Sequence, residues 1–499
     1  GLRYLQQLDF SRMRESITER STLLRIAPHL VDPLPFLLPT YGHMKKGKEA
    51  LTVALKIADC VGFDRNRGLD PSKKLPAGRS ISRNECIRLI PGIKEEGLTG
   101  AVTWYDCQMY SSERLLLSFL LSATEAGAAV ANYVEAVRFI TEGGAVKGIT
   151  AKDLLTGQEF DIRAKVTLNM SGPWLDEIIA AVGPKAKKKR VYPSKAMNIV
   201  VKQIFRDHAV GFPSSHTYKV AGRIVQTGSR YIFTVPWRNH TLIGTTHLYY
   251  DGSPDDFSVT DDDIIQFLDE VNSAHPALAL KRDDVLFTYG GLLPMTPGSL
   301  RKNAVDLVKH YRIYDHGLED GIGGLVSVLG VKYTTARGVS EKAIDHVFKK
   351  LGFSPTTSVS ARRPIYGGDI ESFDDFISQS RRKKPPDIGD DSFDHILHCY
   401  GSRYTDVLKH AEDPHAYDLI TPSSPVTRIQ VLHGVREEMA VKLADVVMRR
   451  TELGSTGFPG EEALTACAHI MKRELGWSDD RTEQELGEVR ALFGQFGQG

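Results

Sequence analysis

The chain has 499 residues, 41% hydrophobic and 25% charged, which is enough apolar material for two or three folded domains. Its 63 lysine and arginine residues nearly balance 62 aspartate and glutamate residues, which excludes a strongly basic nucleic-acid-binding protein. The five widely spaced cysteines exclude a disulfide scaffold and indicate a reducing, cytoplasmic compartment. The longest apolar run, Leu115 to Ala123, is too short to span a membrane.

The first predicted element is a helix that ends at Pro28. Met13 and Ile17 fall on its apolar stripe, whereas Arg12 and Glu19 fall on the opposite, polar face. The following segment, PLPFLLP, contains three prolines, which lack the amide hydrogen and restrict the residue before them. This segment is therefore predicted to be extended.

Sheet structure is predicted next. Residues 130–136 alternate between apolar and polar side chains, and residues 146–151 and 159–163 have the pattern of a hairpin. A short strand over residues 166–170 leads into a glycine turn and then a helix that begins near Trp174. The order predicted here is therefore strand, glycine turn and helix.

Three further strands are predicted over residues 197–205, 231–237 and 241–248, which together predict an antiparallel meander. A capping box at Thr260 predicts the start of one helix, and a second helix is predicted to end at Gly352. The middle of the chain is therefore predicted to alternate between antiparallel strands and single helices.

A polar, charged stretch predicts a domain boundary near residue 375. Residues 1–375 are expected to form an α/β body and residues 376–499 an all-helical domain. Its predicted helices include Glu437 to Arg450 and Glu462 to Leu475.

Two conspicuous clusters are interpreted as structural. The run KAKKKR over residues 185–190 is typical of a solvated loop. His395, His398 and Cys399 share one helix but have no fourth ligand at a suitable spacing, so no metal site is predicted. No GxSxG, HExxH or P-loop motif occurs, which argues against hydrolase and nucleotide-triphosphatase functions.

The segment GIGGLVSVLGVKYTTAR, residues 321–337, predicts an apolar strand that runs through Gly330 into a helix start. Lys332, Thr334 and Thr335 lie at that start. Free amide hydrogens at a helix N-terminus, two hydroxyl groups and a lysine suit an anionic or electron-accepting group.

With the opening GLRYL, this segment resembles the FAD-dependent glycerol-3-phosphate dehydrogenases. The motifs that carry the resemblance follow the family order along nearly the whole chain: RIAPHLVDPLPFLLP (25–39), WYDCQ (104–108), NMSGPW (169–174), PSK (193–195), LIGTT (242–246), GVKYTTAR (330–337), YGS (400–402), LADVVMRRTELG (443–454) and LGW (475–477). The family's GxGxxG fingerprint precedes the segment at which this sequence starts, so the sequence is expected to be a fragment without that motif.

The resemblance implies a Rossmann-like FAD-binding domain without its first strand and glycine motif, an interleaved antiparallel substrate domain and a helical C-terminal domain. The residues implied to contact FAD are Gly1, Leu2, Val134, Ser171, Gly172, Trp174, Gly330, Tyr333 and Thr334. The implied reaction is removal of a hydride from a secondary alcohol carbon to the flavin, with a base taking the hydroxyl proton.

The substrate side departs from the family pattern at three positions. Asn198 stands at the usual histidine, His247 at an aspartate and Leu293 at an arginine. Loss of one charge-assisted hydrogen bond, about 1.5–3 kcal/mol, predicts weaker binding of a phosphate unless another cation compensates. The candidates for compensation are Lys195, Lys309, His310 and Arg312.

Arg3 and Lys332 are predicted to bind the substrate anion, with Tyr4, Lys195, Asn198, Thr246 and Lys309 as further substrate-binding residues. The base is left open between His247, His310 and Lys332. The predicted reaction converts sn-glycerol 3-phosphate to dihydroxyacetone phosphate. Two alternatives remain: a related flavin oxidoreductase acting on another hydroxy acid or polyol, and a flavin-free, non-enzymatic relative.

The resemblance also bears on partners. A phosphorylated polyol is the expected substrate, and the family commonly reduces a membrane quinone. A peripheral contact with the inner face of the cytoplasmic membrane and a homodimer are therefore expected from the resemblance alone.

Overall fold

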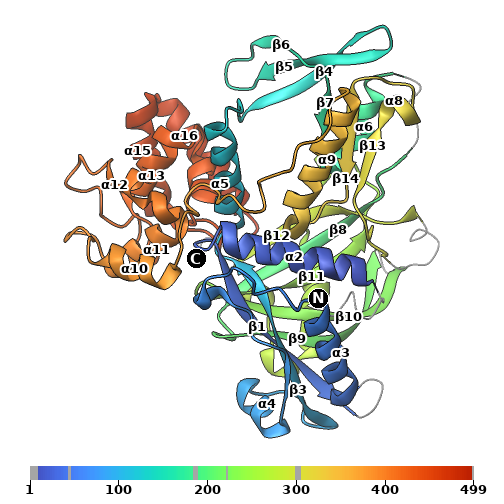
Figure 1. The fold of residues 1–499 in the computed structure, drawn as a ribbon. Coiled ribbons are helices and arrows are strands. Elements are labelled where there is room, and N and C mark those ends of the chain that lie inside the picture. Colours follow the sequence, from blue (N-terminus) through green and yellow to red (C-terminus); the bar gives the residue numbers. More distant parts are fainter. Residues whose placement is uncertain (1–8, 43–46, 184–188, 221–222, 298–304, 497–499) are drawn as a thin grey trace.

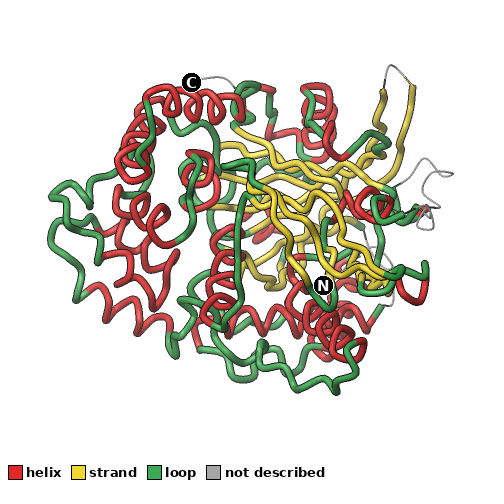
Figure 2. Tube along the Cα trace, turned by 90° about the horizontal axis from the view of Figure 1, so that it is seen from above, coloured by secondary structure: helices red, strands yellow, loops and turns green. Residues whose placement is uncertain are grey.

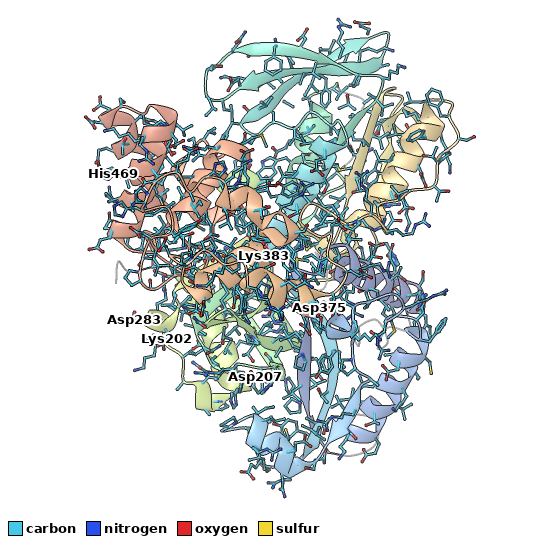
Figure 3. The ribbon with its side chains drawn as sticks, turned by 60° about the vertical axis from the view of Figure 1, so that its left-hand side comes forward. Lys202, Asp207, Asp283, Asp375, Lys383 and His469 are labelled. Atoms are coloured by element: carbon cyan, nitrogen blue, oxygen red, sulfur yellow. The ribbon has the colours of Figure 1, made fainter. Side chains whose placement is uncertain are left out.

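The computed structural model describes residues 9–42, 47–183, 189–220, 223–297 and 305–496. A mixed α/β body carries a helical C-terminal part on one side (Figure 1), and strands occupy the centre of the view from above (Figure 2). Exposed charged side chains of both signs are spread over both parts; Figure 3 labels Lys202, Asp207, Asp283, Asp375, Lys383 and His469.

The largest sheet has eight strands. Their order is β12 (Phe287–Pro294), β8 (Pro193–Lys202), β11 (His240–Tyr249), β10 (Arg223–Trp237), β9 (Ala209–Val220), β1 (Val31–Tyr41), β3 (Leu98–Met109) and β2 (Arg79–Ile81). Neighbouring strands are antiparallel except β1 and β9, which pair in parallel over Phe36 and Leu37. The predicted antiparallel meander is thus part of this sheet.

Two smaller sheets complete the body. One has the order β13 (Arg312–Asp315), β14 (Leu325–Leu329) and β7 (Thr167–Asn169), with β14 and β7 parallel. The other is the meander β4 (Val134–Glu142), β5 (Ala145–Asp153) and β6 (Glu159–Arg163), which projects at the top of Figure 1. The predicted hairpin is β5 and β6.

Helices surround these sheets. Those of the body are α2 (Phe10–Ile26), α3 (Lys48–Val61), α4 (Arg83–Leu89), α5 (Ser112–Glu125), α6 (Leu175–Ala180), α7 (Asp261–Ala274), α8 (His316–Glu319) and α9 (Ala336–Lys350). The C-terminal part has α10 (Phe373–Arg381), α11 (Asp390–Tyr400), α12 (Tyr404–Leu408), α13 (Arg428–Glu437), α14 (Leu443–Asp445), the π-helix η11 (Val446–Arg450), α15 (Glu461–Leu475) and α16 (Asp479–Leu492). Among the described residues, no helix is both long and apolar enough to cross a bilayer.

One hydrophobic core joins the two parts of the chain. Ile199 and Val200 of β8 belong to the same buried cluster as Phe267 of α7, Val446 of η11 and Leu464 of α15. Full burial of such side chains stabilises by about 1.5–3 kcal/mol each. The C-terminal helices are therefore packed rigidly on the sheet that forms the site.

The single helix predicted from Glu437 to Arg450 is wrong. Helix α13 ends at Glu437, Met439 has a positive φ of 55°, and α14 begins only at Leu443. The buried carboxylate of Glu438 accepts hydrogen bonds from Arg114 of α5 at 2.7 Å, which holds the chain in a break that its helical periodicity does not show. Tertiary ion pairing overrides local propensity here.

Other differences have similar causes. Strand β9 was not predicted because Gly211, Pro213 and two serines obscure its pattern; Pro213 is tolerated because β9 pairs with β1 only over its first two residues. Strand β4 begins at Val134, later than predicted.

Arg12 and Glu19 on the predicted polar face of α2 are buried, and Glu19 pairs with Arg337 of α9.

Candidate functional site

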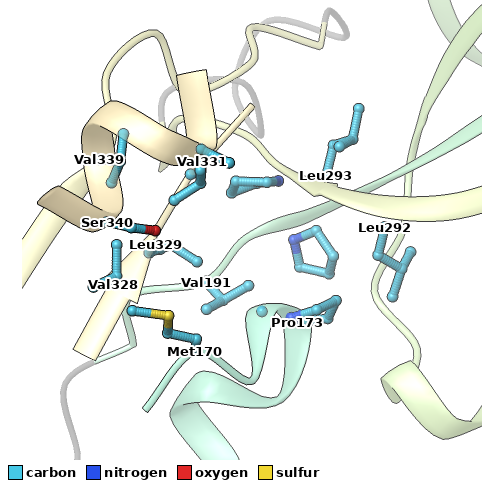
Figure 4. Close-up of a pocket in the computed structure, with 15 residues that line it drawn as sticks. Met170, Pro173, Val191, Leu292, Leu293, Val328, Leu329, Val331, Val339 and Ser340 are labelled. Carbon is cyan, nitrogen blue, oxygen red and sulfur yellow. The ribbon is translucent and has the colours of Figure 1, made fainter. Parts of the chain in front are cut away.

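Three cavities of the body share wall residues. The first, here called the apolar groove, has a volume of about 330 Å³ and is lined mainly by aliphatic side chains of β12, β14 and α9 (Figure 4). The second, the cationic cavity, has about 590 Å³, and the third, the sheet cavity, about 490 Å³. Volumes of roughly 300–1,000 Å³ are typical of ligand sites.

Shared wall residues connect these cavities. Leu293, Pro294, Gly330 and Val331 line both the apolar groove and the cationic cavity, and His247 lines both the cationic cavity and the sheet cavity. The three cavities therefore adjoin one another.

The turn after β14 separates the groove from the cationic cavity. The strand is completely buried, and Gly330 has a φ of 80°, a conformation that favours glycine. Lys332 then precedes the 3₁₀ turn Tyr333–Thr335 and helix α9, and it lies on the wall of the cationic cavity. The structure thus confirms the predicted strand, glycine and helix start.

A second turn, after β7, contributes Met170, Gly172 and Pro173 to the wall of the groove. The side-chain oxygen Oδ1 of Asn169 accepts a hydrogen bond from the Ser171 backbone amide at 3.0 Å, and Gly172 follows with a φ of 59°. The Ser171 hydroxyl and the Asn169 amide nitrogen are buried and have no hydrogen-bond partner among the described residues. Buried polar groups are normally paired, so these two atoms are available to a ligand.

Asn198 lies on the wall of the sheet cavity. Its Oδ1 accepts a hydrogen bond from the Thr245 hydroxyl at 2.9 Å, which directs the donor end of the carboxamide away from Thr245. An amide of this kind can donate to an oxygen of a ligand but cannot take up a proton. His247, two residues after Thr245, is the one histidine among the described residues that line this cavity.

The structure does not bring every predicted residue to the cavities. Lys195 pairs with Asp263 of α7 at 2.6 Å, and His310 lies exposed, 3.7 Å from the carboxylate of Asp9. Arg312 is exposed beside Tyr314, and Thr246 is buried behind the wall. Lys309 does line the cationic cavity.

Of the residues predicted to contact the cofactor, some line the apolar groove and others do not. Gly172 and Gly330 line the groove. The Trp174 indole donates to Asp255 at 2.8 Å, and the Tyr333 hydroxyl donates to the Ser112 carbonyl oxygen at 2.6 Å. Thr334 and Val134 line none of these three cavities, and Gly1, Leu2, Arg3 and Tyr4 lie outside the described residues.

The sequence interpretation missed part of the cationic cavity. Arg12 of α2, His216 of β9, and Gln226 and Arg230 of β10 line it together with Asp306. Arg230 directly precedes the strand predicted over residues 231–237, and no local pattern marks any of these residues as part of a site.

The cluster of His395 and Cys399 proves to be internally paired. Tyr110 lies 2.8 Å from His395 Nδ1, and Arg238 pairs with Glu452 beside it. The ligand atoms of His395, Cys399 and Glu452 lie within 4.8 Å of one another. Burial lowers the pKa of His395 to about 3 and raises that of Glu452 to about 7, so both resist charging.

Comparisons with known proteins agree with this arrangement. A family model described as FAD dependent oxidoreductase matches residues 1–323, and one described as the C-terminal domain of alpha-glycerophosphate oxidase matches residues 358–482. Glycerol-3-phosphate dehydrogenase of Synechocystis sp. is 32% identical, covering 99% of this chain and 88% of the relative. Glycerol-3-phosphate dehydrogenase 2 of Mycobacterium tuberculosis is 29% identical, covering 98% and 79%.

A solved structure shows the same fold. The glycerol-3-phosphate dehydrogenase from Bacillus halodurans, complexed with FAD, aligns with a TM-score of 0.73 at 23% identity over 96% of this chain and 84% of the other. The predicted α/β class, with its Rossmann-like FAD-binding part and helical C-terminal part, is confirmed. The chain therefore belongs to the FAD-dependent oxidoreductases, as a member of the glycerol-3-phosphate dehydrogenase family.

Proposed function

We propose that this protein oxidises sn-glycerol 3-phosphate to dihydroxyacetone phosphate with FAD as its cofactor. The observation that carries the proposal is that the apolar groove adjoins a cavity lined by four cationic side chains, those of Arg12, Arg230, Lys309 and Lys332. A dinucleotide and a small phosphate ester need adjoining sites of these two kinds. The names of the relatives point to the same substrate.

The residues of the apolar groove fit FAD. Apart from Gly172 and its two chain neighbours, no described residue has a heavy atom within 4 Å of the position that a Cβ at Gly172 would take, so ligand atoms can approach that backbone closely. The unpartnered Ser171 hydroxyl and Asn169 amide can bond polar atoms of the cofactor, and the start of α9 favours a negative group. Gly330 and Val331 would then lie beside the ring, next to the cationic cavity.

The substrate phosphate belongs in the cationic cavity. Lys309 and Lys332 approach it from two different segments, which allows them to hold the phosphate while the carbon end points toward the sheet cavity. Binding energy from this remote group orients the reacting carbon. Leu293, on the same wall, contributes no charge.

His247 is the best placed base, because it alone of the three candidates borders both the cationic and the sheet cavity. It takes the proton of the substrate hydroxyl as the carbon–oxygen double bond forms. The Asn198 amide donates to the same oxygen and holds it in place. When bound, FAD supplies the acceptor for the hydride that leaves the carbon.

The same proposal includes a quinone acceptor reached from a peripheral membrane contact. Val53 and Ile57 on α3 are 60% and 40% exposed, and Phe63 just after it is 82% exposed. These apolar side chains follow one side of a short segment that also carries Lys56, a combination that suits the surface of a bilayer. The homodimer expected from the resemblance stays a prediction.

The test uses the holoenzyme without oxygen. Addition of sn-glycerol 3-phosphate should bleach the flavin absorbance and yield one dihydroxyacetone phosphate per flavin. Lys332→Met, which keeps the volume and removes the charge, should lower turnover by roughly ten-fold or more with flavin content intact. A holoenzyme that bleaches with another hydroxy acid or polyol but not with this substrate would favour the alternative that the apolar Leu293 suggests, and a flavin-free protein would contradict both.

A further inference from the structure

Arg230 of β10 is a buried arginine on the wall of the cationic cavity, with only 8% of its side chain exposed. Its Nε donates to Glu270 Oε1 at 3.0 Å, and its Nη2 donates to the Tyr218 hydroxyl at 2.6 Å and also contacts Glu270 Oε2. The guanidinium is therefore held on one side by two separate elements, β9 and α7.

The carboxylate of Glu270 is itself held in place by hydrogen bonds. The Ser214 hydroxyl donates to its Oε1 at 2.5 Å, and the Tyr218 hydroxyl donates to Oε2. Burial alone would raise the pKa of Glu270, but the hydrogen bonds and charge of Arg230 lower it below its ordinary value. The carboxylate thus stays ionised and fixes the guanidinium in one orientation.

The remaining side of the guanidinium is uncommitted. A guanidinium has five N–H donors, and the contacts above use those of Nε and Nη2. Nη1 makes no hydrogen bond to a described residue, and Arg230 itself lines the cavity. Two donors are therefore available for an anion.

Neighbouring groups suit a phosphorylated polyol. The buried Gln226 Oε1, on the same wall, has no partner among the described residues and can accept from a hydroxyl. Lys309 and Lys332 line the same cavity, and Asp306 is its one carboxylate among the described residues. Leu293 lies there too, at the position where the family resemblance implies an arginine.

We propose that Arg230, held by Glu270 and Tyr218, binds the substrate phosphate and supplies the charge-assisted contact that Leu293 cannot make. This inference rests on the proposed function, because it takes the phosphate ester as substrate. It makes Arg230 a substrate-binding residue and Glu270 a positioning residue. The competing view is that the pair only anchors α7 to the sheet.

The first experiment compares matched conservative substitutions. Arg230→Lys keeps the charge but cannot hold Glu270, Tyr218 and a phosphate together. Arg114→Lys alters another buried arginine–glutamate pair, with Glu438, that lines none of the three cavities. We expect a rise in KM for sn-glycerol 3-phosphate of about ten-fold for Arg230→Lys alone. Equal KM values in the two variants would overturn the inference.

A second variant guards against misfolding. The double change Arg230→Met with Glu270→Met removes the pair without leaving a buried lone charge, which proteins often tolerate. Its KM should also rise by at least about ten-fold, and adding Leu293→Arg should restore much of the loss. A KM that stays at the wild-type value in this double variant would assign the pair to anchoring only.

Binding of inorganic phosphate to the holoenzyme separates failure of this inference from failure of the proposed function. Calorimetric titration should give a phosphate dissociation constant about ten-fold higher for Arg230→Lys than for wild type or Arg114→Lys. If wild type binds phosphate through Arg230 but does not oxidise sn-glycerol 3-phosphate, the proposed substrate is wrong and the anion site stands. Equal phosphate binding by all three proteins would overturn the anion site.

Discussion

Gly244 of β11 lies directly against the carboxamide of Asn198 on β8. The two residues are paired across the strands, and a Cβ at Gly244 would lie 1.7 Å from Asn198 Oδ1. The glycine therefore leaves the space that the carboxamide occupies beside the Thr245 hydroxyl. Gly244 is therefore required in the LIGTT motif, because any side chain there would displace Asn198, a candidate substrate-binding residue.

Gly244→Ala should accordingly displace Asn198 from the sheet cavity. We expect kcat/KM to fall by roughly ten-fold, the effect of one lost hydrogen bond to the substrate oxygen, and stability to fall by about 1–3 kcal/mol from overpacking. Steady-state kinetics and urea unfolding measure the two effects. Gly291→Ala is the matched control, because no described residue beyond its chain neighbours has a heavy atom within 4 Å of a Cβ there. Equal activity of both variants would contradict the assigned role of Asn198.

Two lysines predicted from the sequence should behave differently. Lys309 lines the cationic cavity, whereas Lys195 is paired with Asp263 and bonds the Ser258 carbonyl oxygen at 3.0 Å. We expect Lys309→Met to raise KM for sn-glycerol 3-phosphate by about ten-fold and Lys195→Met to leave KM within two-fold while lowering the unfolding temperature. A larger KM effect from Lys195→Met would show that the pair with Asp263 opens when substrate binds.

The sequence predicted those parts of the site that depend on local chemistry. Gly330 and Lys332 follow from a buried strand that must turn into a helix, and the structure shows that order. The same pattern gave no way to distinguish Lys309 from Lys195, since both lie on or near β-rich segments. Only the packing of α7 against the sheet shows that Lys195 forms an ion pair with Asp263.

Long-range pairing explains the remaining errors. The partner of Arg230 is Glu270, forty residues away on a different element, so no local pattern marks Arg230 as part of a site. The helix break after Glu437 depends on Arg114, more than three hundred residues earlier. Both involve buried charges whose geometry is set by tertiary structure, whereas propensity and periodicity act within a few residues.

His29 should make stability depend on pH. Its ring is fully buried, both ring nitrogens lack hydrogen-bond partners among the described residues, and burial, followed by the charge of Arg114, lowers its pKa to about 3. As pH falls, this histidine is protonated in the unfolded chain near pH 6.5, but in the folded protein only near pH 3. The unfolding free energy is therefore unaffected by His29 above about pH 6.5 and decreases as pH falls from about 6.5 toward about 3.

At pH 5 this histidine should lower the unfolding free energy by about 2 kcal/mol relative to pH 7.5. The leucine of the His29→Leu variant cannot be protonated. Between pH 7.5 and pH 5 the variant should therefore lose about 2 kcal/mol less unfolding free energy than the wild type. Urea unfolding of both proteins at pH 7.5 and 5 measures the difference. Parallel losses in wild type and variant would show that His29 does not resist protonation.

The last prediction concerns Asn198 and Leu293. From the sequence, both side chains are expected to contact the same substrate molecule, so the effects of Asn198→His and Leu293→Arg on KM are expected to be non-additive. The structure separates them: Leu293 pairs with Ser194 and Asn198 with Tyr289, four residues apart along β8, or roughly 13 Å. They also line different cavities, the cationic cavity and the sheet cavity.

We therefore expect Leu293→Arg to lower KM for sn-glycerol 3-phosphate by about ten-fold, through a new contact with the phosphate, and Asn198→His to act mainly on kcat, through the reacting oxygen. The double variant should combine the two effects within about 0.5 kcal/mol of additivity, as is usual for sites more than about 7–10 Å apart. Steady-state kinetics of the four proteins closes this double-mutant cycle. A coupling energy above about 1 kcal/mol would mean that one substrate group touches both positions, and the division of the site into a phosphate end and a reacting end would then be wrong.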